Sequence, residues 1–363
     1  MILEYPNLKG LFPVGRNKMT PEDFAYQIDK AYAGLGIPTL YGVLSILANK
    51  SVFFIGERGT GKTRIIKSVP ELENTYVSKW DTFTYSELSN YCSNIPTVNN
   101  HLVFKVEELA TFSKYHKELF LTVCSKIISE GSFEHLTKHS PNLSIKNCKL
   151  TMLIAIQPLI YNQLCTKYTA WEALTSDRFT KFVIINPLRE ETIDVDLVPT
   201  LPRKISNRVS YNKNNLNLTK LVEVFKGHVS EGRANLYARD YAIAMAKFMS
   251  DGFVEQKHIN AFFDLFSPYL NAFSVLQKAE NMDSPVVVTT GNLRLLGEIG
   301  KYMDFVSKAK LAKDLHVDER SVERAAKELV EVGLIGKPSN HAGKYRLSEW
   351  LIDYFRKYKE NIT

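Results

Sequence analysis

Eight consecutive residues match the pattern G-x-x-x-x-G-K-[ST] of a phosphate-binding loop: Gly56, Glu57, Arg58, Gly59, Thr60, Gly61, Lys62 and Thr63. Three glycines let the backbone turn sharply and point its N–H groups inward, where they form an anion site with the start of the following helix. We expect Lys62 to reach the β- and γ-phosphates of a nucleoside triphosphate and the Thr63 hydroxyl to ligate Mg²⁺. The pattern therefore predicts ATP and Mg²⁺ as cofactors.

Two adjacent carboxylates, Glu107 and Glu108, follow the apolar run His101–Val106. Enzymes with a phosphate-binding loop need one acid to hold the water shell of Mg²⁺ and often a second to polarise the attacking water. We assign the first task to Glu107 and the second to Glu108. Exposed acids are also common at strand ends, but the position of this pair after the loop favours the catalytic interpretation.

These residues need buried strands to position them. The apolar run 52–55 predicts a strand directly before the loop, and His101–Val106 predicts one before the acid pair. Further strands are expected at 150–156 and 179–185, and a helix at 112–129. Weaker strand patterns occur at 75–77 and 83–84. The alternation of strands and helices predicts an α/β fold with a parallel sheet.

Composition narrows the class of protein. The chain has 363 residues, enough for two or three domains, and a net charge of +7, which favours acidic partners such as nucleic acid. Its four cysteines are scattered, so neither a disulfide framework nor a zinc knuckle is expected. No signal peptide or membrane-spanning run is evident, and we expect a cytoplasmic protein without membrane contact.

Two further short motifs lie downstream. The predicted strand 150–156 is followed by Gln157 and Pro158, and Arg178 stands before Phe179 in the step 174–179. With the loop and the acid pair, in this order, these motifs resemble those of AAA+ ATPases. More narrowly, they resemble the branch with a β-hairpin inserted after the acid pair, which includes MoxR ATPases and MCM replicative helicases. The resemblance covers residues from about 35 to 270.

The resemblance implies roles for single residues. Gln157, where the family usually has Asn, would contact the γ-phosphate and the attacking water. Arg178 would be an arginine finger presented to the nucleotide of a neighbouring subunit, which implies a homo-oligomeric ring, a hexamer in this family. Arg233 would sense the nucleotide of its own chain, with Arg239 as the alternative. Glu107 replaces the usual Asp, so the two departures at Glu107 and Gln157 leave the hydrolysis rate open.

The last part of the chain, 292–360, resembles a winged helix-turn-helix domain. Helices are expected at 292–304, 307–315 and 319–332, and strands at 334–335 and 345–347 flank a basic wing. Such domains place the third helix in the major groove of DNA. The candidate DNA contacts are Arg320, Ser321, Arg324 and Lys327 on that helix and Lys337 and Lys344 in the wing. Many winged helices contact only proteins, so that alternative stays open.

Together these interpretations divide the chain into three parts. They are an AAA+ ATPase core over 1–200, a basic linker and an α-helical lid over 201–280, and a winged-helix domain over 281–363. The predicted function is that of a ring-forming ATPase that remodels, loads on or moves along DNA. The alternatives are a MoxR-type chaperone that remodels protein partners, and a nucleotide-switched DNA-binding regulator with slow hydrolysis.

Overall fold

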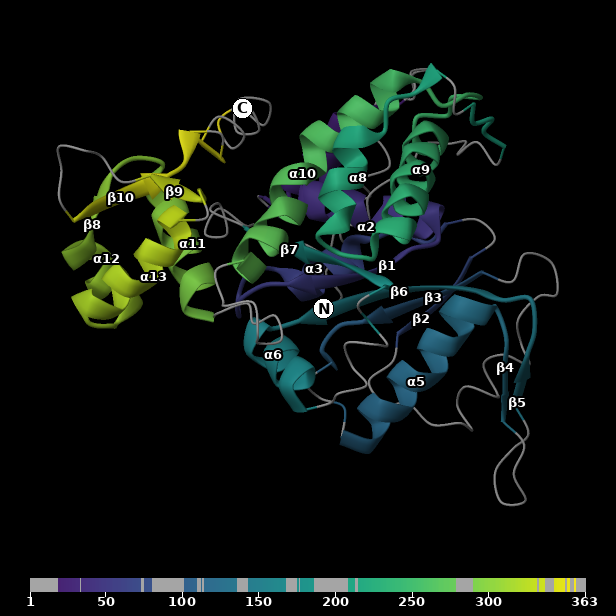
Figure 1. Ribbon diagram of the computed structural model, residues 1–363, viewed down its shortest axis with the longest axis horizontal. Coiled ribbons are helices and arrows are strands. Elements are labelled where there is room, and N and C mark those ends of the chain that lie inside the picture. Colours follow the sequence, from purple (N-terminus) through teal and green to yellow (C-terminus); the bar gives the residue numbers. More distant parts are fainter. Residues whose placement is uncertain are drawn as a thin grey trace, which may run out of the picture.

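The computed structural model describes most of the chain in ordered elements (Figure 1). The described residues are 19–32, 34–72, 75–79, 101–109, 112, 114–135, 143–167, 175, 177–185, 208–212, 215–278, 290–331, 333–336, 343–349, 351–352 and 356. Of the sequence predictions, the strand at 83–84 and the DNA-contact candidate Lys337 lie outside them.

A five-stranded parallel sheet forms the centre of the molecule, with the order β2-β3-β6-β1-β7. Its strands are β1 (Ser51–Ile55), β2 (Thr75–Lys79), β3 (His101–Val106), β6 (Lys149–Ile156) and β7 (Phe179–Val183). All of them point the same way, so the residues that follow each strand gather at one edge of the sheet. The prediction of an α/β fold with a parallel sheet is therefore confirmed.

Helices cover both faces of the sheet (Figure 1). Phe53 and Ile55 belong to one buried cluster with α5 (Lys114–Glu130) and α6 (Pro158–Lys167). Val52 and Phe54 belong to the other, with α2 (Gly36–Ala48) and α3 (Lys62–Ser68). Successive strand residues point to opposite faces, so an uninterrupted apolar run supplies both clusters.

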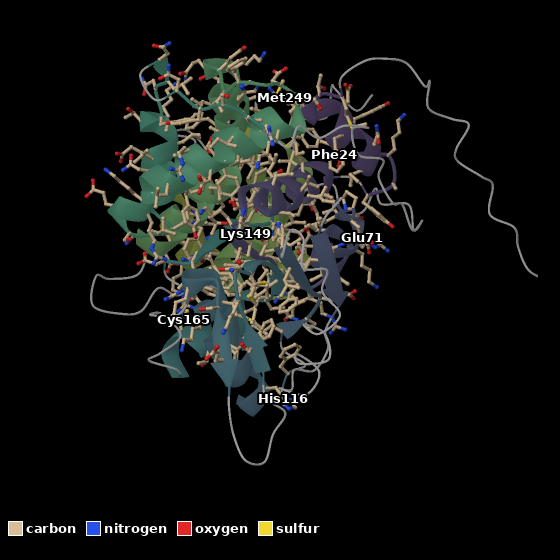
Figure 2. The ribbon with its side chains drawn as sticks, turned by 90° about the vertical axis from the view of Figure 1, so that its right-hand side faces the viewer. Phe24, Glu71, His116, Lys149, Cys165 and Met249 are labelled. Carbon is tan, nitrogen blue, oxygen red and sulfur yellow. The ribbon has the colours of Figure 1, made fainter. Side chains whose placement is uncertain are left out.

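A second layer of helices packs over α2. It comprises α1 (Pro21–Asp29), α8 (Thr219–Lys226), α9 (Glu231–Phe248) and α10 (Gln256–Lys278). The Phe24 ring of α1 meets Phe248 at a centroid distance of 5.6 Å, and Figure 2 shows Phe24 close to the neighbouring Met249. Tyr241 stacks on Phe225 at 5.2 Å and shares a 3.0 Å hydrogen bond with Ser45. The aromatic residues of the helical segment thus attach it to the sheet layer.

A short antiparallel hairpin follows α5, as the sequence predicts. It pairs β4 (Phe133–His135) with β5 (Leu143–Ile145) and extends beyond the end of α5 in Figure 1. Gly131 ends the helix with a φ of 66°, a conformation that glycine adopts at little cost. Lys146 lies 3.2 Å from Glu134, so part of the positive charge of this hairpin is paired.

Three helices and a small antiparallel sheet make up most of the described part of the C-terminal unit. The helices are α11 (Thr290–Tyr302), α12 (Lys308–Leu315) and α13 (Glu319–Glu331), and the strands are β8 (Val306–Ser307), β9 (Ile335–Gly336) and β10 (Lys344–Leu347), in the order β8-β10-β9. Ser307 caps α12 by accepting a hydrogen bond from the Lys310 N–H. Apolar residues of this unit belong to the same continuous buried cluster as the large sheet.

Candidate functional site

The glycine-rich loop, residues 56–63, connects β1 to α3 at the carboxyl edge of the sheet. Gly61 has a φ of 86°, and a Cβ built on it would lie 2.5 Å from a methyl group of Leu35. A Cβ on Gly56 would lie 2.7 Å from the Thr60 hydroxyl. The positive φ at Gly61 favours glycine there, and a Cβ at Gly56 would require the Thr60 hydroxyl to shift.

The Lys62 side chain folds back over this loop. Its ammonium donates a 2.7 Å hydrogen bond to the backbone oxygen of Glu57, and the Thr60 hydroxyl donates to the same oxygen at 2.8 Å. Burial lowers the pKa of Lys62, while the charges of Glu108 and Glu57 act in the opposite direction. A buried ammonium held by a single backbone oxygen is well placed to exchange that oxygen for a phosphate oxygen.

One pocket of about 440 Å³ brings together residues from three strand ends. We call it the loop pocket; it is lined by Leu35, residues 58–64, Glu108 and Gln157. Glu108 follows β3 and Gln157 follows β6, so residues far apart in the sequence meet at the loop because their strands are parallel and close in the sheet. The structure thus assembles the predicted lysine, hydroxyl, acid and amide around one space.

Glu107 has a different environment. It does not line the loop pocket, and its carboxylate lies 3.5 Å from the ammonium of Lys67 on α3. Among the described residues, no group of three or more His, Cys, Asp or Glu side chains is arranged to hold a metal ion. The residues present therefore fit Mg²⁺ only in the way it is commonly bound beside phosphates, with Thr63 as one ligand and the phosphates and water as the others.

A second pocket of about 450 Å³ adjoins the loop pocket, and Arg58 and Thr60 line both. This side pocket is also lined by Glu57, by Ile184 and Ile185 after β7, and by residues of α11 and α12, including Arg294. Burial raises the pKa of the Glu57 carboxyl, against the opposing charges of Arg294 and Lys62. Sequence reasoning missed Arg294, because no motif marks it.

Arg178 and Arg233 lie outside both pockets. Arg178 Nε donates to the Ser129 hydroxyl at 2.6 Å, and Arg233 donates to the backbone oxygen of Asp177 at 2.7 Å. The Asp177 carboxylate accepts the Ser230 N–H at 2.7 Å and fixes the start of α9 there. Neither arginine lines the loop pocket or the side pocket, whereas the resemblance implies that Arg233 senses the nucleotide of its own chain.

The DNA-contact candidates that the structure describes lie on the C-terminal unit. Arg320, Arg324 and Lys327 are exposed on α13, and Lys344 is exposed at the start of β10. Ser321 is hydrogen-bonded within its own helix. Its N–H and its hydroxyl both donate to Asp318, each at 2.8 Å, so that Asp318 caps the start of α13. Glu319 and Glu323 each lie 3.5 Å from Lys308 of α12.

The fold and these pockets define an α/β protein whose glycine-rich loop lies at the carboxyl edge of a parallel sheet. No family model matches the chain, and a comparison with curated proteins found no match. Within the part of the chain that the structure describes, no helix is both long and apolar enough to cross a bilayer.

Proposed function

We propose that this chain is an AAA+ ATPase that assembles as a ring and acts on DNA. The observation that carries the proposal is the loop pocket, in which Lys62, Thr63, Glu108 and Gln157 surround one space. In this proposal the parallel sheet is the AAA+ core, α8 to α10 form its lid, and the C-terminal unit is a winged-helix domain. The loop pocket binds the triphosphate of ATP.

The chemistry follows from the positions of the side chains. Lys62 exchanges the Glu57 oxygen for oxygens of the β- and γ-phosphates and stabilises their charge. Glu108, across the pocket, takes the proton of the attacking water, and the Gln157 amide orients that water. Thr63 would hold Mg²⁺ in part, and the metal would supply positive charge against the phosphates.

The arginines outside the two pockets are assigned to the contact between subunits. Arg233 contacts Asp177, the residue before Arg178, and neither arginine lines a pocket at the loop of its own chain. In a ring, the same surface of one subunit meets the loop pocket of the next, because each contact is head to tail. We therefore assign Arg178 as the arginine finger and Arg233 as a neighbouring contact in the same interface.

Complementation between two inactive variants tests this assignment. Arg178→Ala is expected to lower ATP turnover about 10³-fold or more, as arginine fingers do. Lys62→Ala retains the finger and lacks the nucleotide site. In an equal mixture, roughly a quarter of the sites combine an intact loop with an intact finger from the neighbour, and activity returns. A mixture whose turnover does not exceed that of the two separate variants would overturn the finger assignment.

DNA binding is proposed for α13 and the strand β10. The double variant Arg324→Ala, Lys327→Ala is expected to reduce the slope of log affinity for duplex DNA against log salt by about 2, one unit for each lost phosphate contact. The matched control is Lys226→Ala, Lys257→Ala, which removes two exposed charges from α8 and α10. Equal slopes for both double variants would refute a specific role for α13. Absence of DNA binding at low salt would instead support the chaperone alternative.

One observation favours a nucleotide-switched regulator as the second candidate. The Glu107 carboxylate lies 3.5 Å from the Lys67 ammonium and does not line the loop pocket. Mg²⁺ in the loop pocket would then lack the contribution that the sequence predicts for Glu107. Slow hydrolysis would then prolong the ATP-bound state. The rate of ATP hydrolysis with increasing DNA separates the two candidates: stimulation that salt weakens supports the ring ATPase, and DNA binding without stimulation supports the regulator.

A further inference from the structure

The side pocket lies between the glycine-rich loop and the C-terminal unit. One wall is formed by Glu57, Arg58 and Thr60 of the loop, and the opposite wall by α11 and the end of α12. Apolar residues, among them Ile184, Ile185 and Leu296, also line the pocket. Because the side pocket adjoins the loop pocket at Arg58 and Thr60, a group on its far wall faces the loop.

Arg294 is the cation on that far wall. Its side chain is exposed, and among the described residues no hydrogen bond or ion pair holds its guanidinium. Arg294 and Glu57 line the same pocket, and the positive charge of Arg294 lowers the pKa of the Glu57 carboxyl, against the larger effect of burial. Arg294 therefore lies close enough to the loop to affect its charge.

The two other acids of the side pocket have partners of their own. Glu298 lies 3.0 Å from the ammonium of Lys301, and Asp314 accepts the Tyr302 hydroxyl at 2.5 Å. Glu57 differs, because one oxygen of its carboxylate is buried and accepts no hydrogen bond. Arg294 and the Glu57 carboxylate thus line one pocket and interact through space.

We propose that Arg294 senses the terminal phosphate of ATP and that the C-terminal unit thereby completes the nucleotide site of its own chain. This inference rests on the proposed function. A triphosphate carries more charge than Glu57 and offers paired oxygens that match the two-pronged guanidinium. When ATP occupies the loop pocket, Arg294 leaves Glu57 and binds the γ-phosphate. ADP lacks that phosphate and leaves Arg294 beside Glu57.

The contact would connect nucleotide state to the helix proposed to bind DNA. Arg294 is on α11, and the Asn292 amide of the same helix donates a 2.6 Å hydrogen bond to Glu328 of α13. A movement of α11 toward the loop therefore moves α13 with it. Because coupling between two binding sites is reciprocal, DNA on α13 should change the affinity for ATP by the factor by which ATP changes the affinity for DNA.

The test compares the affinities of the full chain for ATP and for ADP by calorimetric titration with Mg²⁺. Arg294→Ala is expected to weaken ATP about tenfold, the effect of one charged hydrogen bond, and to leave ADP unchanged. The matched control, Lys313→Ala, removes an exposed cation of α12 that lines neither pocket and should change neither affinity. Equal losses for ATP and ADP, or no loss, would overturn the proposal.

A double-mutant cycle provides an independent readout. Glu57→Gln removes the competing carboxylate, so it should raise the affinity for ATP in the wild-type background and have a smaller effect beside Arg294→Ala. Equal effects of Glu57→Gln in both backgrounds would show that the two side chains act separately and would refute the switch. If the wild-type chain bound neither ATP nor ADP, the proposed function itself would fail. If the wild-type chain bound both and Arg294→Ala bound ATP with the same affinity, only the role of Arg294 would fail.

Discussion

Lys62→Ala should weaken the binding of ATP by on the order of 100-fold, because a charged hydrogen bond to phosphate contributes about 3 kcal/mol. The lysine is buried, and its ammonium already lies over the loop, 2.7 Å from the Glu57 backbone oxygen. No other described lysine lines the loop pocket. Its removal therefore leaves the triphosphate with the backbone N–H groups and the nearby arginines only.

Equilibrium titration with ATP measures this loss, and thermal unfolding monitors the fold of the variant. The matched control is Lys30→Ala, which removes an exposed lysine that lines neither pocket. A Lys62→Ala protein that unfolds at the wild-type temperature and binds ATP with wild-type affinity would refute the phosphate-binding role of the loop.

Glu108→Gln should retain ATP binding and lose turnover. Replacing the carboxylate by an amide keeps the shape of the side chain at the pocket wall and removes its ability to accept a proton. The contribution of a general base is about 10²- to 10⁴-fold in rate, so we expect a fall in that range. The affinity for ATP should change far less, because Glu108 acts on water and not on the phosphates.

Single-turnover hydrolysis together with ATP titration separates these two effects. Glu71→Gln is the matched control, because Glu71 is exposed near the end of α3 and lines neither pocket (Figure 2). Wild-type turnover in Glu108→Gln would remove Glu108 from the role of base and direct attention to Glu107, the other member of the pair.

The sheet was largely predictable because its strands are buried on both faces. Mostly apolar runs are typical of such strands, and the predicted strand His101–Val106 has the bounds that β3 shows, although it includes the buried Lys105. The strand expected at 179–185 ends at Val183, although its last residues remain buried. β8 was missed, because two residues, Val306 and Ser307, are too few to show any period.

The candidate site was predictable in part for a related reason. The loop and the residues that follow β3 and β6 are local motifs, and the parallel sheet then brings them to one edge. The side pocket depends instead on how the C-terminal unit packs against the end of β7, which apolar residues far apart in the sequence decide. The position of Arg294 in the side pocket and the ion pair between Glu107 and Lys67 both depend on packing, so no pattern along the chain indicated them.

The release of inorganic phosphate from ATP tests the central claim most directly. The purified wild-type chain should release phosphate continuously in the presence of Mg²⁺, and Lys62→Ala, measured in parallel at the same concentration, should give the rate of the buffer alone. Removal of Mg²⁺ by a chelator should abolish the wild-type rate. Phosphate release by the wild type that equals that of Lys62→Ala, with both proteins folded and DNA present, would contradict the account.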